Sequence, residues 1–356
     1  MRTRTGSSPT IETIARHAGV STASVSRVLR GLGGLPETVK KVQAAAAELG
    51  YVPNAMARSL RGGQSRQVTF AMPDIGNPVY VAMMRHIQAT AGAAGYRLLL
   101  HSTQADPVEE LAALRALADR HSDGLILCPI RVTPAHLDEL GRAAAPVVVI
   151  GSLPEDLAVD SVRADSVTGA ELAVRHLADT GRRRIGLLNG PADTVPGAAR
   201  HQGYERALAA CGLRYDDALT ASGRFDAQSG EEAARRLLDR VPDLDALFCA
   251  NDLIAVGALR ALRSTGRTVP QDVAVVGVDN TDLAEACWPA LTSVDLGAHE
   301  RGRLAAELLL SRLGDEVQAP VSRLAVQPRL IVRESCGASA AHADQVGGPS
   351  QHKEIP

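Results

Sequence analysis

The chain of 356 residues has few cysteines and no long apolar run. Its five cysteines lie far apart and include no Cys-x-x-Cys pair, which argues against structural zinc and disulfide bonds and fits a reducing compartment. No run of about 18 apolar residues occurs, so the sequence predicts no membrane span. Because no apolar core follows Arg2 and Arg4, we expect a cytoplasmic location rather than secretion.

Common catalytic motifs are also missing. The sequence has no Gly-x-x-x-x-Gly-Lys-Ser/Thr loop for phosphates, no Gly-x-Ser-x-Gly and no His-Glu-x-x-His, and its ten histidines are scattered. An enzyme is therefore the weakest candidate class, and neither a cofactor nor a metal site is expected.

Positive charge is concentrated near the N-terminus. Residues 1–66 hold ten Lys or Arg and three acidic residues, a net +7, whereas the remaining residues hold 28 and 37, a net −9. A basic segment on an acidic body indicates a polyanionic partner for that segment alone, although a solvated charged surface gives the same pattern.

Two short helices are predicted within the basic segment. Thr10 is a suitable N-cap for a helix to residue 18, along which apolar side chains form one stripe. Gly19 breaks that helix, and Ser21 can cap a second one that runs to about Arg30. Two short helices joined by a glycine turn are typical of a helix-turn-helix.

The outward face of the second helix carries groups that suit DNA. Its N-terminal residues would reach base edges in the major groove: Thr22 can hydrogen-bond, Ala23 can contact a thymine methyl, and Arg27 can bind guanine or phosphate. Serine hydroxyls suit phosphate oxygens, and a polar face in water is the alternative. The DNA contacts predicted here are Thr10, Ser21, Thr22, Ala23, Ser24, Ser26 and Arg27.

A third helix is expected from about Glu37 to Leu49, followed by Gly50. The run Ala18-Gly19-Val20-Ser21, Val25-Ser26-Arg27-Val28-Leu29, Leu49-Gly50-Tyr51, Pro53-Asn54 and Ala57-Arg58-Ser59-Leu60 resembles the head of the lac repressor/galactose repressor family. The resemblance implies a hinge helix that folds on operator DNA, with Asn54 and Arg58 among its contacts. It also implies that Leu60 wedges into the central base step.

One part of the head departs from that family. The stretch 31–37 is about one residue short and lacks the serine that caps the third helix in relatives. Pro36 would then stand in the first turn of that helix, and Val39 replaces a customary arginine.

After a short polar linker, buried-strand patterns alternate with amphipathic helical ones. This alternation predicts parallel sheets covered on both faces, and it is too long for one sheet. We therefore expect an α/β body of two Rossmann-like subdomains with a cleft between them. The predicted strands are 68–72, 97–100, 124–128, 147–150, 185–188, 246–249 and 273–278. The predicted helices include 79–94, 107–120, 167–180, 200–211, 228–240 and 253–265.

Polar residues stand where several of these strands and loops end, so they can face the cleft. Asn251 and Asp252 follow one strand, Asp279 follows another, and Arg200 is expected to begin a helix. Asp252 suits either a ligand contact or, as we favour, an N-cap of the next helix. Such amide, carboxylate and guanidinium groups bind hydroxyls or a carboxylate of a small molecule.

The body resembles the type-I periplasmic sugar-binding proteins and the effector-binding core of the same repressor family. The stretches that carry this likeness include 73–78, 123–127, 250–259, 276–279 and 289–294. Gly151 and Pro196 replace a frequent Asp and a frequent Ser or Thr. By this resemblance, the effector would bind Asn77, Tyr80, Arg200, Phe225, Asn251 and Asp279.

Together these patterns predict a ligand-responsive, sequence-specific transcriptional regulator, most simply a repressor. We expect a homodimer on near-palindromic operator DNA, controlled by a small-molecule effector such as a sugar, with no membrane partner. A transport binding protein is the alternative, but it would lack residues 10–60. The predicted domains are the helix-turn-helix (1–50), the hinge and linker (51–66), the effector-binding and dimerisation body (67–335) and a disordered tail (336–356).

Overall fold

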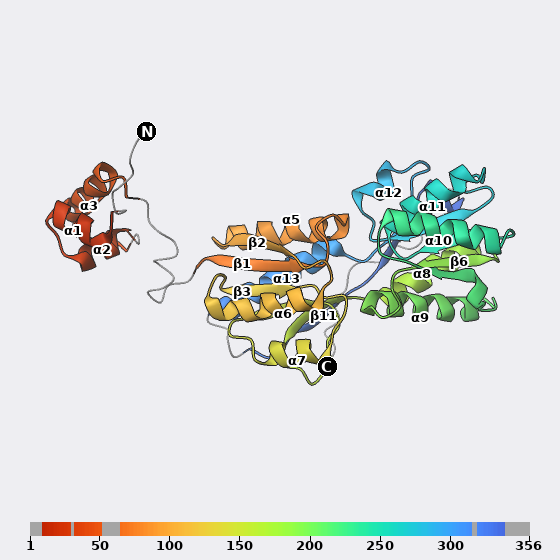
Figure 1. Ribbon diagram of the computed structural model, residues 1–356, viewed down its shortest axis with the longest axis horizontal. Coiled ribbons are helices and arrows are strands. Elements are labelled where there is room, and N and C mark those ends of the chain that lie inside the picture. The colour runs from red at the N-terminus through yellow and green to blue at the C-terminus, as the bar shows by residue number, and fades with distance from the viewer. Residues whose placement is uncertain (1–8, 30–31, 52–64, 315–318, 339–356) are drawn as a thin grey trace. The chain divides into compact units, whose positions relative to one another are not determined.

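The computed structural model describes residues 9–29, 32–51, 65–314 and 319–338. Contacts divide the chain into two units, residues 1–65 and 66–356, which we call the head and the body and describe separately (Figure 1). The expected tail lies outside the described residues from position 339 onward. Cys336 is fully buried, so the ordered body continues past residue 335, where the sequence placed its end.

Three helices form the head: α1 (Ile11–Ala18), α2 (Thr22–Leu29) and α3 (Pro36–Glu48). The Thr10 side chain caps α1 by accepting from the Thr13 N–H. Gly19 ends this helix at a φ of 64°, a left-handed conformation that a residue without Cβ adopts at little cost. At the start of α2, the Ser24 N–H donates to Ser21 Oγ at 3.2 Å. Both predicted N-caps are therefore present.

The head has a small core where the three helices meet. All three helices contribute buried residues to it, and those of α1 belong to the apolar stripe predicted there. The buried residues are Ile14, Ala15, Val25, Val42 and Ala45.

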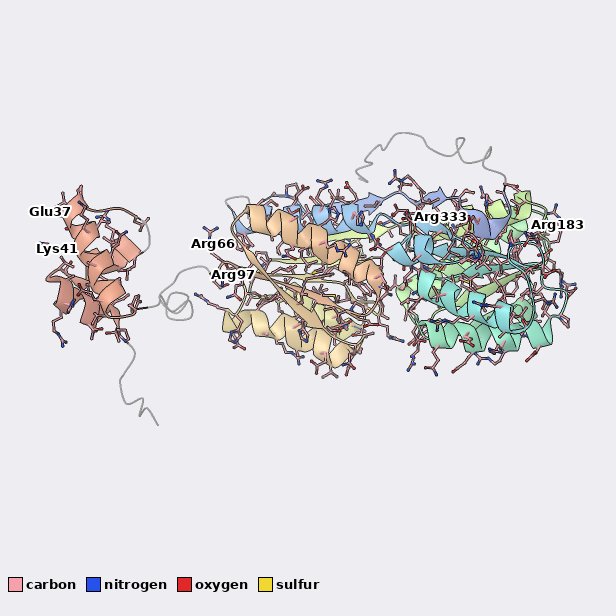
Figure 2. All side chains as sticks on the ribbon, turned by 90° about the horizontal axis from the view of Figure 1, so that it is seen from above. Glu37, Lys41, Arg66, Arg97, Arg183 and Arg333 are labelled. Atoms are coloured by element: carbon pink, nitrogen blue, oxygen red, sulfur yellow. The ribbon has the colours of Figure 1, made fainter. Side chains whose placement is uncertain are left out.

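The start of α3 bears out the predicted loss of a cap. Leu35 occupies the N-cap position, no side chain caps the helix there, and a proline stands in its first turn. Figure 2 labels Glu37 and Lys41, which lie one turn apart on α3.

The first subdomain of the body is built on a parallel sheet with strand order β11-β5-β4-β3-β1-β2. Helices α5 and α13 cover one face of this sheet, and α6 and α7 cover the other (Figure 1). The strands are β1 (Gln67–Met72), β2 (Arg97–Ser102), β3 (Gly124–Leu127), β4 (Val147–Ile150), β5 (Asp160–Ala164) and β11 (Arg323–Val326). The helices are α5 (Pro78–Ala93), α6 (Pro107–Arg115), α7 (Pro134–Gly141) and α13 (Ala298–Leu313), with a 3-10 turn at Ala116–Asp119.

The second subdomain has a sheet of order β12-β10-β9-β8-β6-β7, in which only the pairing of β12 with β10 is antiparallel. Alternate side chains of its strands enter two cores, because successive residues of a strand point to opposite faces. In β8, Leu247 packs against α10 and α11, and Phe248 packs against α8 and α9. The strands are β6 (Ile185–Asn189), β7 (Thr220–Ser222), β8 (Ala246–Cys249), β9 (Ala274–Val278), β10 (Thr292–Asp295) and β12 (Arg329–Ile331). The helices are α8 (Ser166–Asp179), α9 (Val195–Ala210), α10 (Ala227–Arg240), α11 (Asp252–Ser264) and α12 (Asp282–Ala286), with 3-10 turns at Asp217–Leu219 and Glu334–Cys336.

The parallel strands of both sheets begin at the outer ends of the body. Arg66 and Arg97 stand at the starts of β1 and β2, and Arg183 precedes β6. Figure 2 shows the first two arginines at one end of the body and Arg183 at the other. The carboxyl ends of both sets of strands therefore face the junction of the subdomains, where ligands bind in folds of this kind.

The chain passes between the subdomains at several points. It leaves the first after β5, returns between β10 and α13, and leaves again between β11 and β12. The two Rossmann-like subdomains predicted from the sequence are thereby confirmed.

Some local expectations were wrong. Strands β5, β7, β10 and β11 were not predicted, because they are short and partly polar. Helix α9 begins at Val195 rather than at Arg200: the Thr194 side chain accepts from the Gly197 N–H and caps it, and Pro196 fits its first turn. Across the described residues, no helix is long and apolar enough to cross a membrane.

Candidate functional site

The exposed face of α2 is the candidate DNA-binding surface of the head. Thr22, Ala23 and Arg27 are exposed, while Val25 between them is buried in the core. The buried valine fixes the rotation of the helix, so the three exposed side chains share the outward surface.

The hydroxyl groups predicted to meet phosphates already support the helix ends. Ser21 Oγ and Ser24 Oγ lie 2.9 Å apart, and Thr10 Oγ1 accepts from the Thr13 N–H at 3.3 Å. A hydroxyl that accepts from the backbone still has its own proton to donate. Ser26 is half-buried.

The three predicted hinge contacts, Asn54, Arg58 and Leu60, lie outside the described residues. Their roles stay predictions from the resemblance.

A cavity of about 190 Å³ lies between the two subdomains of the body. Side chains from both subdomains line it, and it is several times larger than the roughly 10–15 Å³ that one water needs. The structure brings all six predicted effector residues to this cavity, although their positions span more than 200 residues of sequence. They are Asn77, Tyr80, Arg200, Phe225, Asn251 and Asp279.

A buried ion pair stands at the centre of this set. Arg200 Nη2 lies 3.7 Å from Asp279 Oδ1, and less than a tenth of either side chain is exposed. The Arg200 guanidinium also lies 5.7 Å from the centre of the Phe225 ring. Burial raises the pKa of Asp279, while Arg200 and Arg301 act to lower it. Arg200 Nε has no protein partner, so this guanidinium retains a free donor for a ligand.

The N-cap of α11 is Asn251 and not Asp252, as we had favoured, although Asn251 also lines the cavity. Asn251 is the N-cap of α11: its Oδ1 accepts from the Ile254 N–H at 2.8 Å, and its Nδ2 donates to Phe225 O at 3.3 Å. Asp252 is not the cap, because the helix begins one residue earlier than that assignment required. Its carboxylate instead accepts from the Thr281 N–H and hydroxyl at 2.7 and 2.9 Å, and from Ser293 Oγ at 2.6 Å.

Asp252 thereby holds the loop that presents Asp279. Asp279 has a φ of 101° and donates its N–H to Val294 O at 2.8 Å, so its backbone is held in an unusual conformation. Burial, and after it the charge of Asp279, raises the pKa of Asp252 to about 7, although the hydrogen bonds from Ser293 and Thr281 oppose that change.

The sequence analysis missed several residues of the cavity wall. Arg163, Asp165 and Arg301 line it but were not predicted, because they belong to β5, to the N-cap of α8 and to α13. Gly190 lies behind one wall residue: a Cβ there would lie 2.0 Å from the Phe225 ring. Gly151 and Pro196, where the chain departs from the family pattern, also line the cavity and contribute no polar side-chain group.

Two contacts join the subdomains beside the cavity. Arg131, after β3, donates to Asp193, after β6, through Nε at 2.7 Å and Nη2 at 3.1 Å. The Val195 N–H donates to Ile130 O at 2.8 Å. The subdomains are thus held together across the cavity.

Among the described residues, no group of three His, Cys, Asp or Glu side chains could hold a metal ion.

Two family models match the chain. The model for "Bacterial regulatory proteins, lacI family" matches residues 10–54, and the model for a periplasmic binding protein-like domain matches residues 174–336. These matches fall on the head and on the part of the body that includes the second subdomain.

Similar proteins cover nearly the whole chain. It is 39% identical over 336 residues to the HTH-type transcriptional regulator CelR of Thermobifida fusca. The matched residues cover 92% of this chain and 98% of CelR. It is 33% identical over 327 residues to the HTH-type transcriptional repressor CytR of Escherichia coli (strain K12). The matched residues cover 92% of this chain and 96% of CytR.

Solved structures agree. A structure described as a transcriptional regulator CelR–cellobiose complex has a TM-score of 0.71 at 37% identity and covers 92% of this chain and 99% of that one. The lac repressor dimer bound to operator and the anti-inducer ONPF has a TM-score of 0.83 at 25% identity and covers 93% and 100%.

A helix-turn-helix head joined to a periplasmic-binding-protein-like body defines a class of transcriptional regulators. The chain belongs to the LacI family of bacterial regulatory proteins. The resemblance stated from its sequence is confirmed.

Proposed function

We propose that this regulator represses transcription by binding operator DNA through its head, and that a small polar effector in the body cavity controls that binding. The observation that carries the proposal is the convergence of Arg200, Asp279 and Phe225 on one cavity between the subdomains. The function is one of binding rather than catalysis, and it requires a cytoplasmic location, where the DNA lies.

On the DNA side, Thr22, Ala23 and Arg27 would contact base edges, because Thr22 and Ala23 are exposed at the start of α2 and Arg27 is exposed in its last turn. Thr10, Ser21, Ser24 and Ser26 would position the head on phosphates. Asn54, Arg58 and Leu60 would act in the hinge. A single helix-turn-helix has a small footprint, so two chains as a homodimer would bind a near-palindromic site.

On the effector side, a sugar or a related hydroxylated metabolite suits the wall. Amide, carboxylate and guanidinium groups together donate to and accept from hydroxyls, and Phe225 offers an apolar face. The similar CelR has been solved in complex with cellobiose. In this chain the effector would contact Asn77, Tyr80, Arg200, Phe225, Asn251 and Asp279.

Effector and DNA would communicate through the angle between the subdomains. A ligand that contacts both walls favours the closed arrangement, which Arg131 and Asp193 already bridge. Closure then changes the operator affinity, and operator changes the effector affinity by the same factor.

The test begins with selection of a preferred site from random DNA, followed by fluorescence-anisotropy titration with and without candidate sugars. Arg200→Ala is expected to weaken effector binding about ten- to hundredfold, since a charge-assisted hydrogen bond contributes about 1.5–3 kcal/mol. Arg206→Ala is the matched control, because Arg206 is exposed on the same helix. Selection that yields no preferred sequence, or an Arg200 variant that keeps the full effector response, would contradict the proposal.

A further inference from the structure

Arg301 is a buried cation that has no hydrogen-bond or ion-pair partner among the described residues, although its charge helps to lower the pKa of Asp279. Its side chain belongs to α13, lines the cavity, and has only 9% of its surface exposed. No hydrogen bond or ion pair joins its guanidinium to any described residue, and its Nε is fully enclosed. Such a group is uncommon, because taking an unpaired charge out of water costs several kcal/mol.

Several carboxylates of the first subdomain are paired with other residues. Glu300, its neighbour in sequence, binds Arg303 with a shortest distance of 2.6 Å. Glu110 lies 2.9 Å from His136, and Asp160 lies 2.7 Å from Arg312. Each of these acids already has a cationic or hydrogen-bonding partner of its own.

The acids nearest the cavity are engaged as well. Asp279 is paired with Arg200. Asp165 accepts from the Thr168 N–H and hydroxyl as the cap of α8, and Asp295 accepts from the Gly297 N–H. Burial keeps the carboxyl of Asp252 partly protonated near neutral pH by raising its pKa to about 7.

The charged side chains that line the cavity therefore sum to one excess positive charge. They are Arg163, Arg200, Arg301, Asp165 and Asp279. Within the part of the chain that the structure describes, Nε of Arg200 and Nε of Arg301 are both buried without an acceptor. A cavity with an excess cation and unused guanidinium donors matches an anionic group, for which the forked geometry of arginine is suited.

We infer that the effector carries a negative charge, as a carboxylate or phosphate on a hydroxylated framework, and that Arg301 is the residue that selects for it. The inference rests on the proposed function in placing the effector in this cavity. Arg200 and Asp279 would hold the hydroxylated part, and Arg301, reaching in from α13, would bind the anionic group.

The test compares neutral and anionic members of matched pairs by calorimetric titration of the full chain. The probes are glucose with glucuronate, cellobiose with cellobionate, and ribose with ribose 5-phosphate, so that carboxylate and phosphate are separated. At least one anion is expected to bind ten- to hundredfold more tightly than its neutral partner, as a charge-assisted hydrogen bond allows. Neutral members that bind as tightly as the acids, or a panel in which no acid binds, would overturn the inference.

Substitutions of Arg301 test whether this side chain causes the preference for an anionic ligand. Arg301→Met should reduce the affinity for the preferred anion at least about tenfold and leave its neutral partner within about threefold, while Arg301→Lys should keep part of the preference. Arg303→Met is the matched control, since Arg303 lies on the same helix but pairs with Glu300 and Glu307. Equal losses for the neutral and anionic members would show that Arg301 is structural and would refute its role.

Stability without ligand gives a further measurement. Replacing an uncompensated buried cation by an apolar side chain of similar length relieves its desolvation cost, so Arg301→Met should raise the thermal midpoint of the ligand-free body. An unchanged or lower thermal midpoint would contradict the inference that Arg301 is buried without a compensating charge.

The two proposals fail in different ways. If a neutral sugar alters operator binding and no acid does, the regulator function stands and the charge inference falls. If an acid binds through Arg301 but leaves operator binding unchanged, the charge inference stands and the effector part of the proposed function falls.

Discussion

The residues that form the head lie close together in the sequence, whereas the residues that line the cavity of the body lie far apart. The core and exposed face of the head come from residues 10–51, and α1 and α2 each begin at a side-chain cap beside them. The cavity draws its wall from Asn77 to Arg301, through strand ends and helices of two sheets. A surface built from adjacent residues follows from local patterns, whereas a cavity of this kind depends on the topology that brings distant strand ends together.

The head and the body also differ in the size of their buried apolar cores. The head has five buried core residues, while four larger clusters fill the body. A core as small as that of the head rarely supplies more than about 3–5 kcal/mol. A single substitution in the core of the head should therefore unfold the head and leave the body folded.

Val25→Asp is expected to have the largest effect. A carboxylate buried without a partner costs about 3–5 kcal/mol or more, which equals the stability that such a core supplies. Calorimetry should show loss of the head transition with the body transition retained, and specific operator binding should fall at least about thousandfold. Leu32→Asp is the control, because Leu32 is 62% exposed. If the body transition disappears as well, the two regions are not independent.

Asp252→Asn sharpens the comparison by removing a pH dependence from the stability of the body. Because the pKa of Asp252 is raised to about 7, the folded protein keeps a proton that the unfolded chain releases near pH 4. This contribution to stability is fully present below about pH 4 and is lost as the pH rises through about 7. Between pH 4 and 8 the wild type should therefore lose up to about 4 kcal/mol relative to the Asn variant.

Urea denaturation across that range measures the difference. Asp272 supplies a control of opposite sign: its hydrogen bonds with Thr268 lower its pKa, so its contribution is lost as the pH falls. Parallel pH profiles for the wild type and Asp252→Asn would disprove the assignment.

Arg131→Ala should have the smallest effect. Its pairing with Asp193 joins the subdomains, but Asp193 is largely exposed, and solvent screens the interaction. The variant should favour the open arrangement and weaken the binding of any effector by less than about tenfold, with a smaller difference in high salt. Calorimetry with small-angle scattering tests this, and the exposed Arg142→Ala serves as control. Complete loss of binding would mean that Arg131 contacts the ligand directly.

Particular residues show where sequence reasoning succeeded and failed. Gly19 and Ser21 marked the turn and the second helix, because cap preferences are local. Asp252 was assigned as a cap although the cap is Asn251, because either residue suits that position and only the backbone of the folded chain distinguishes them. The start of α9 was placed too late because the cap signal at Thr194 was overlooked.

The sequence by itself determined the helices of the head, the alternation of strands and helices, and the polar residues at strand ends, since each depends on short-range periodicity. Only the tertiary structure decided which of these meet. Strand β5 pairs with β11 across the first sheet, and Arg312 binds Asp160 although 152 positions separate them. The same folding carries Arg301 into the cavity. Its sequence neighbours give no sign of this, because burial and charge compensation depend on contacts that form only when distant segments pack together.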